Sequence, residues 1–225
     1  MTLTKYQDLV ACRKNCRLCT ELKNPAETSL AVHDSDQIGP WSRLAADLCA
    51  EVLVVGQDWG DVRYFKENKG VDLPLNPTTN TLRCLLQILN RDLPSKIDSG
   101  KGSGIFLTNA ILCLKDGGMQ SKVHREWFDN CGKHFLLPLI ELISPVIVVT
   151  LGEMAYRTVV SSYELRPSKF RDAVETEGGV NLPGGRKLFP VYHCGQRILN
   201  THRKKVVQIE DWKRIRRYLD QGRPA

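Results

Sequence analysis

The sequence predicts an α/β fold, a three-layer α/β/α sandwich around a mostly parallel four-stranded sheet. Short apolar runs without alternation are typical of strands that are buried on both faces of a parallel sheet. Such runs lie at residues 52–55, 104–109, 146–151 and 188–192. Helical stretches separate the runs, and no repeat or linker marks a second domain. We therefore expect one domain over residues 1–225.

Helical periodicity predicts the elements between the strands. Leucines at helical spacing share one face of residues 81–90, as in an amphipathic helix that packs on a sheet. Pro190 in the last strand favours an edge position, because proline cannot donate a hydrogen bond to a neighbouring strand. Further helices are expected at residues 4–15, 125–143, 153–160 and 206–219, with a helical turn near residues 41–48. In the last helix, Val206, Ile209, Trp212 and Leu219 are expected to face inward.

Composition narrows the class of protein. At 42% hydrophobic and 25% charged residues, the chain reads as an ordinary globular protein. It has no apolar run of the roughly 18 residues that a membrane span needs, and its first residues lack an apolar signal core, so we expect a cytoplasmic protein. The net charge of +7 favours an acidic partner, nucleic acid above all. We expect a monomer that binds DNA and does not associate with membranes.

The eight cysteines suggest ligation rather than disulfides, because intracellular proteins seldom keep disulfides. Cys16 and Cys19 form a CxxC pair, which lets two thiolates converge on one metal centre from a tight turn. Cys12 adds a third thiol one helical turn earlier.

Polar side chains follow three of the predicted strands. Asp58 comes after the first strand, Asn109 ends the second and His193 ends the last. In a parallel sheet these ends lie at one edge, where α/β proteins bind their ligands. A carboxylate can position water and stabilise a sugar cation, a carboxamide can read a base edge, and an imidazole can donate to a leaving oxygen. Taken singly, each residue is equally well explained as an ordinary turn or strand-end side chain.

Three stretches resemble the uracil-DNA glycosylase superfamily, closest to its iron–sulfur, family 4-like branch. Residues 108–113 (TNAILC) resemble the family's strand that ends in Thr-Asn before a cluster cysteine. Residues 131–152 resemble its next cysteine, helix and Leu-Gly strand. Residues 189–193 (FPVYH) resemble the strand that ends in the motif histidine. The resemblance extends from Cys12 to about His202.

The resemblance implies a cofactor. It makes Cys16, Cys19, Cys113 and Cys131 the ligands of a four-iron four-sulfur cluster, with zinc as the alternative occupant. Cys12 could replace Cys16, although the CxxC spacing favours Cys16. No ligand role is assigned to Cys49, Cys84 or Cys194.

The first active-site motif departs from that branch, in which it usually reads Gly-Glu-Gly-Pro-Gly. Residues 56–60 read GQDWG, more like a branch whose motif begins Gly-Gln-Asp and whose Asp activates water. Asp58 is therefore the expected catalytic carboxylate, with Asp61 in reserve and His193 as its partner. In the branch with the Gly-Gln-Asp motif, a tyrosine stands at the position of Gly60, and this tyrosine excludes 5-substituted pyrimidines. The expected base-binding residues are Gln57, Trp59, Gly60, Tyr64, Phe65 and Asn109.

The second motif is also altered. The family's His-Pro pair, followed by Ser or Ala, is replaced here by residues 193–197 (HCGQR). In the family this segment inserts a wedge into DNA, a role for which Gln196, Arg197 and Leu199 are the candidates. Arg203 and Lys204 belong to a basic run suited to phosphates, although such runs are as often plain solvated surface.

The resemblance implies a monofunctional DNA glycosylase that removes uracil or a 5-modified pyrimidine flipped out of DNA and leaves an abasic site. The alternative is an iron–sulfur DNA-binding module of the same fold that has lost hydrolysis. A nucleotide-processing enzyme is a weaker alternative, because the sequence has no phosphate-cradling GxGxxG or GKS loop.

Overall fold

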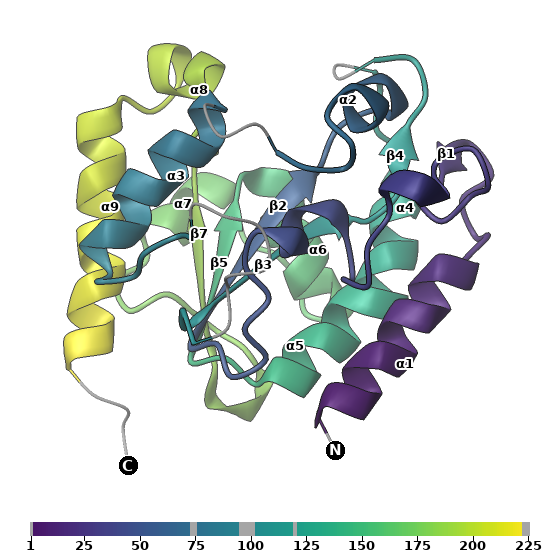
Figure 1. Ribbon diagram of the computed structural model, residues 1–225. Coiled ribbons are helices and arrows are strands. Elements are labelled where there is room, and N and C mark those ends of the chain that lie inside the picture. Colours follow the sequence, from purple (N-terminus) through teal and green to yellow (C-terminus); the bar gives the residue numbers. More distant parts are fainter. Residues whose placement is uncertain (1, 73–75, 95–101, 119–120, 222–225) are drawn as a thin grey trace.

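The computed structural model describes residues 2–72, 76–94, 102–118 and 121–221 (Figure 1). Within these ranges a five-stranded sheet has the order β3-β2-β5-β7-β6. Neighbours among the first four strands are parallel, and β6 is antiparallel to β7. The sandwich and the mostly parallel sheet are therefore confirmed, with five strands instead of four. The strands are β2 (Val52–Asp58), β3 (Ile105–Ile111), β5 (Ile147–Leu151), β6 (Val180–Asn181) and β7 (Lys187–Val191).

The additional strand β6 is short enough to leave Pro190 of β7 without a partner in that strand. The two-residue strand β6 is too short to leave a periodic signal in the sequence. It pairs only with Lys187 and Leu188 of β7, so Pro190 lies beyond this pairing. On its other side, Pro190 is in register with Thr150 of β5. The end of β7 thus has the edge character that the proline predicted, although β6 covers its beginning.

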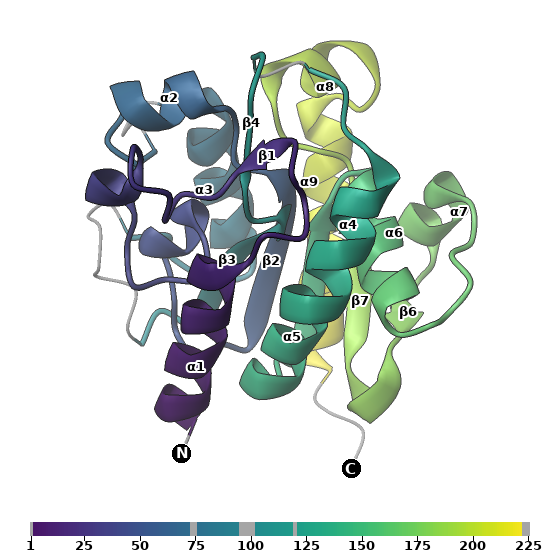
Figure 2. The same ribbon diagram turned by 90° about the vertical axis from the view of Figure 1, so that its right-hand side faces the viewer.

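Helices cover both faces of the sheet (Figures 1 and 2). Alternate residues of β2 point to opposite cores: Leu53 and Val55 to one, Val52 and Val54 to the other. The first core is completed by α1 (Thr2–Asn15), α4 (Arg125–Cys131), α5 (Leu137–Ile143), α6 (Glu153–Ser162) and α7 (Phe170–Glu175). The second is completed by α2 (Val62–Glu67), α3 (Pro77–Ile88) and α9 (Lys205–Asp220).

The helix predicted over residues 125–143 contains a π-helical turn, Gly132–Leu136, between α4 and α5. Gly132 lies against α6, where a Cβ atom would come within 2.5 Å of the Ser162 hydroxyl oxygen. The glycine therefore lets the two helices approach closely. The helix ends where predicted, because Ser144 adopts a left-handed conformation directly before Pro145.

A short antiparallel ribbon outside the main sheet was not predicted. It pairs β1 (Leu22–Lys23) with β4 (Leu114–Lys115), and each strand follows a cysteine closely. Leu22 and Leu114 are buried, so the ribbon packs against the body of the protein. Figure 2 shows the ribbon near the end of the sheet to which β2 leads.

The last helices differ slightly from expectation. Trp212 and Ile215 of α9 are buried, but Val206, expected to face inward, is 64% exposed because it lies in the first turn, beyond the edge of the core. None of the helices in the described part of the chain is long and apolar enough to cross a bilayer. The remaining helical segments are α8 (Gln196–Thr201) and the 3₁₀ turns Ala31–His33, Pro40–Arg43 and Pro183–Gly185.

Candidate active site

A cavity of about 140 Å³ lies at the carboxyl ends of the parallel strands. Its lining includes residues of β2, β3 and β5, of α2 and the start of α3, and His193, which follows β7. Figure 1 shows α2 and α8 on opposite sides of this edge of the sheet. Six of the predicted site residues line the cavity: Gln57, Asp58, Trp59, Tyr64, Asn109 and His193.

Gly56 forms part of the cavity floor. The apolar run predicted a strand over residues 52–55, but β2 continues through Gly56 to Asp58. Gly56 is in register with Asn109 of β3. A Cβ atom at Gly56 would lie 2.6 Å from the Asn109 amide nitrogen and 3.0 Å from the Trp41 ring. Glycine is therefore required here for close approach, because any side chain would displace Asn109 from the cavity.

Both carboxylate oxygens of Asp58 are engaged. Oδ1 lies 3.2 Å from the Lys115 ammonium nitrogen, in an ion pair whose side chains are only 4% (Lys115) and 9% (Asp58) exposed. Oδ2 accepts a hydrogen bond of 2.7 Å from the Gln57 amide. The carboxylate thus has a defined orientation at the end of β2. The sequence did not identify Lys115, which comes from the unpredicted ribbon.

His193 is held as a hydrogen-bond donor. The Gly195 backbone N–H donates to its Nδ1 at 3.0 Å, so the proton of the neutral ring is on Nε2. Burial lowers the pKa of His193, and the nearby Asp58 carboxylate opposes that shift only in part. The ring is therefore neutral at pH 7, with an Nε2–H available to a ligand. A Cβ atom at Gly195 would lie 2.8 Å from Nδ1, which gives the altered His-Cys-Gly motif a structural reason.

A polar wall faces the strand ends. The Trp59 and Tyr64 rings pack with centroids 5.0 Å apart. Asp72 accepts hydrogen bonds from the Tyr64 hydroxyl at 2.9 Å, from the Asn76 amide at 3.0 Å and from the Thr79 hydroxyl. Sequence reasoning predicted the two aromatic residues of this wall but missed Asp72, Asn76 and Thr79. The one available signal was Asn76 before a proline, the pattern of a helix start, and Asn76 does cap α3.

Three other predicted residues are not among the described residues that line this cavity. The Asp61 carboxylate instead caps α2, accepting from the Tyr64 N–H at 2.7 Å. Phe65 is fully buried and packs edge-on against Trp59 at 5.7 Å. The Gly60 carbonyl accepts from the Lys115 N–H at 3.3 Å. These residues support the cavity wall from behind.

The four cysteines expected to be ligands line a second cavity, of about 180 Å³. Burial raises the pKa of Cys131 to about 12, and it also raises the pKa of the Cys113 thiol strongly. The Asn130 amide lies 3.4 Å from the Cys19 sulfur. In the described part of the chain, no group of three or more His, Cys, Asp or Glu side chains is arranged to hold a single metal ion. The four thiols instead line a cavity that is larger than a single metal ion.

The other cysteines lie elsewhere. Cys12, Cys49 and Cys84 are exposed. Cys194 is buried beside the active-site cavity, with its sulfur 3.6 Å from the Thr78 carbonyl oxygen. None of the four is among the described residues that line the cysteine cavity.

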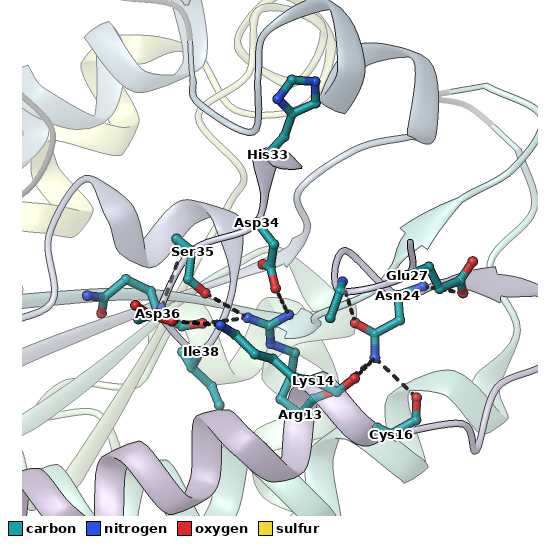
Figure 3. Close-up of polar contacts among 12 residues, drawn as sticks. Arg13, Lys14, Cys16, Asn24, Glu27, His33, Asp34, Ser35, Asp36 and Ile38 are labelled. Carbon is teal, nitrogen blue, oxygen red and sulfur yellow. Dashed lines mark hydrogen bonds and ion pairs between the residues drawn. The ribbon is translucent and has the colours of Figure 1, made fainter. Parts of the chain in front are cut away.

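A polar network holds the CxxC segment in place (Figure 3). Arg13, which is 1% exposed, donates to the Asp34 carboxylate at 2.8 Å and to the Gln37 carbonyl at 2.8 Å. The Asn24 amide donates to the carbonyls of Arg13 at 2.8 Å and Cys16 at 3.1 Å. The end of α1 is thereby anchored where Cys16 meets the cavity.

The expected DNA contacts differ in availability. Gln196 and Arg197 of α8 and the following Lys204 are exposed, and Leu199 is half-buried. Arg203 forms two hydrogen bonds to the buried Asp211, at 3.0 and 2.6 Å, and lies over the Tyr192 ring. Its guanidinium is therefore engaged within the protein.

Comparison with known proteins identifies the class of protein to which this chain belongs. The family model of the uracil DNA glycosylase superfamily matches residues 46–216, and the chain belongs to this superfamily. One relative, a type-4 uracil-DNA glycosylase of Thermotoga maritima, is 23% identical over 51% of this chain and 56% of its own length. The chain thus spans about half the length of that relative. A type-5 uracil-DNA glycosylase of Pyrobaculum aerophilum is 25% identical over 92% of this chain and 89% of its own length.

Proposed function

We propose that the protein is a monofunctional DNA glycosylase, which hydrolyses the N-glycosidic bond of uracil or a 5-modified pyrimidine flipped out of DNA and leaves an abasic site. The observation that carries this proposal is the convergence of Asp58, Asn109 and His193 on one cavity at the carboxyl ends of parallel strands. The superfamily and the names of both relatives support the same reaction class.

Asn109 and His193 recognise and polarise the base in this mechanism. A carboxamide offers an acceptor and two donors, which suits the edge of a pyrimidine. The His193 Nε2–H donates to the O2 atom of the base, where negative charge develops as the glycosidic bond breaks. A neutral histidine serves this purpose, because it stabilises the departing anion without having to transfer its proton.

Asp58 serves the sugar side of the bond. Its carboxylate stabilises the positive charge that develops on the deoxyribose and positions the attacking water. The contact with Lys115 and the hydrogen bond from Gln57 hold it in one orientation. Such preorganisation lowers the barrier, because little reorganisation is needed during the reaction.

The polar wall supports the broader choice of substrate. Trp59 and Tyr64 supply aromatic surface for the flipped base. Gly60 contributes no side chain, so the steric wall that a tyrosine would form is open. Asp72 bonds to both Tyr64 and Asn76, so this polar pair holds the aromatic surface in place. These features favour a 5-modified pyrimidine over uracil alone.

The cysteine cavity supports a four-iron four-sulfur cluster held by Cys16, Cys19, Cys113 and Cys131. The fit rests on four thiols around one cavity that is buried enough to raise the pKa values of three of them, Cys19, Cys113 and Cys131. Cationic iron would favour the thiolates in these surroundings. Zinc is the alternative occupant, because four cysteine thiolates also form structural zinc sites. The bound cluster would tie the CxxC segment to β4 and α4.

DNA is the proposed partner, and α8 is the part of the protein placed to meet it. Helix α8 lies at the edge of the sheet to which the strand ends lead (Figure 1). Its Gln196 and Arg197 are exposed, and the chain carries a net charge of +7. Lys204 adds an exposed cation suited to a phosphate.

The decisive experiment is an excision assay. The protein is incubated with oligonucleotides that carry uracil, thymine mispairs or 5-substituted pyrimidines, and abasic sites are then cleaved with alkali. We expect excision, and we expect Asp58→Asn to lower the rate constant by a factor of about 10²–10³. Asp61→Ala is the matched control, which loses a helix cap worth about 0.5–2 kcal/mol of stability but keeps the rate constant. An absence of excision on every base would instead favour the DNA-binding module.

A further inference from the structure

Lys115 has an unusual position for a lysine. Its side chain is 4% exposed and its ammonium group faces the Asp58 carboxylate at 3.2 Å. Lysine is almost never buried to this degree unless it is paired. Taking two charges out of water is costly, so such a pair is poor evidence of a contribution to stability. Its position at the end of β2, next to the candidate catalytic cavity, points to a role in the site.

The main chain of Lys115 is also attached to the active-site loop. Its N–H donates to the Gly60 carbonyl at 3.3 Å, and Asp61 forms a β-bridge with it. On the other side Lys115 pairs with Leu22 of β1. Lys115 is thus held from both sides, by the loop after Asp58 and by the ribbon.

The same ribbon leads directly to the cysteine cavity. Cys113 is two residues before Lys115, and Cys19 is three residues before Leu22, its partner in the ribbon. Any group that draws the cysteines together therefore restrains both strands of the ribbon. This places a continuous covalent and hydrogen-bonded connection between the cysteine cavity and the Asp58 carboxylate.

Lys115 supports the site from behind its wall. It is not among the described residues that line the active-site cavity, whereas Asp58, which its ammonium group contacts, does line it. A nucleophile would have to reach the sugar carbon, whereas a buried ammonium group that contacts the carboxylate can only orient it. The geometry therefore favours a positioning role over covalent catalysis.

We propose that Lys115 is the positioning residue that fixes the orientation of Asp58 for glycosidic-bond hydrolysis, and that the ribbon of β1 and β4 holds Lys115 in place. This inference rests on the proposed glycosylase function. Lys115 holds Oδ1 and Gln57 holds Oδ2, so the carboxylate that lines the cavity is restrained at both oxygens. Loss of Lys115 frees the carboxylate to rotate, and the fraction of molecules in which Asp58 is correctly oriented falls.

The test is single-turnover excision by Lys115→Met and Lys115→Arg on the best substrate of the wild type. We expect Lys115→Met to lower the rate constant on the order of 10²-fold, the scale of a misplaced catalytic group. The affinity for DNA and the amplitude of the reaction are expected to stay unchanged. Lys115→Arg, which keeps the charge on a different geometry, is expected to be intermediate. Lys5→Met removes an exposed lysine of α1 and is the matched control, expected to behave as the wild type.

Amplitude separates positioning from folding. At equal concentrations of enzyme and substrate, a purely structural role would lower the fraction of active molecules, and thus the amplitude of the first turnover, while the remaining molecules react at the wild-type rate constant. If Lys115→Met does not fold, Lys115→Arg carries the test on the same criterion. A wild-type rate constant in either folded variant, or a loss of amplitude alone, would overturn the inference. Excision by the wild type is measured first, and its absence on every substrate would instead refute the proposed function and remove the basis of this inference.

Discussion

The backbone N–H of Gly195 donates a hydrogen bond to Nδ1 of His193, with 3.0 Å between the two nitrogens. A ring nitrogen that accepts this bond cannot carry a proton, so the other nitrogen presents the donor to the cavity. One main-chain N–H thus determines which ring nitrogen of His193 can donate a hydrogen bond to a ligand. A Cβ atom at position 195 would lie 2.8 Å from the same nitrogen, which explains why this residue is glycine.

We expect Gly195→Ala to lower the excision rate constant by roughly 10²-fold, because a displaced catalytic group loses its alignment. The added Cβ atom would lie 2.8 Å from Nδ1 and 2.9 Å from Cε1 of His193, and both contacts force the ring to move. Single-turnover excision measures this loss. Cys194→Ser, which changes the neighbouring position without adding bulk, is the control, and an equal loss in that variant would contradict the explanation.

The pH dependence of activity follows from His193. Its pKa is lowered by burial, so the ring stays neutral at and somewhat below its ordinary value of about 6.5. We expect the excision rate constant to be level from about pH 7.5 to pH 6.5 and to decline only at lower pH, as the ring gains a second proton and loses the bond from Gly195. A decline that begins above about pH 7 would show that the ring is charged in the active enzyme.

The same shift predicts how stability changes with pH. Because the folded state has the lower pKa, the unfolded state binds more protons as pH falls below about 6.5. The contribution of His193 to the free energy of unfolding is therefore complete above about pH 6.5 and is lost as pH falls through the folded pKa. Urea unfolding at pH 7.5 and pH 5.5 measures this effect. We expect a smaller loss of stability on acidification in His193→Gln than in the wild type.

Replacing cysteines tests the proposed cluster. Cys113→Ser removes a thiol from the buried cavity, and we expect it to abolish visible absorption by the cluster and to lower stability, because metal binding is coupled to folding. Cys84→Ser removes an exposed thiol of α3 and is expected to change neither property. Iron and sulfide analysis of the purified proteins provides the independent measurement. Stoichiometric zinc in the wild type would contradict the cluster.

The basic residues after α8 are expected to separate into two kinds. Lys204→Ala should weaken DNA binding and make the slope of log K against log salt shallower by about one unit, as expected for one lost phosphate contact. Arg203→Ala should instead cost about 1–3 kcal/mol of stability, because among the described residues the buried Asp211 carboxylate would keep only its bond from Arg214. Fluorescence anisotropy across salt concentrations and urea unfolding distinguish the two. A shallower salt slope in Arg203→Ala at unchanged stability would reverse its assignment.

The strands and most helices could be predicted because their signals are local. β-branched runs, leucine spacing and a proline stop each act within a few residues, and the structure has the corresponding elements close to the expected positions. Strand ends could also be predicted to meet, because parallel topology places them at one edge of the sheet. For this reason Asp58, Asn109 and His193 could be expected to lie together before any coordinates were known.

The sequence by itself determined the fold class, the superfamily resemblance and the candidate catalytic and base-binding residues at the strand ends. Tertiary structure alone decided which of them face the cavity, assigning Asp61 to a helix cap and Phe65 to the core. It also supplied Lys115, from a ribbon whose pairing joins residues 22 and 115. Contacts between residues so distant in the chain leave no periodic signal, because they depend on packing between elements and not on the conformational preferences of either segment.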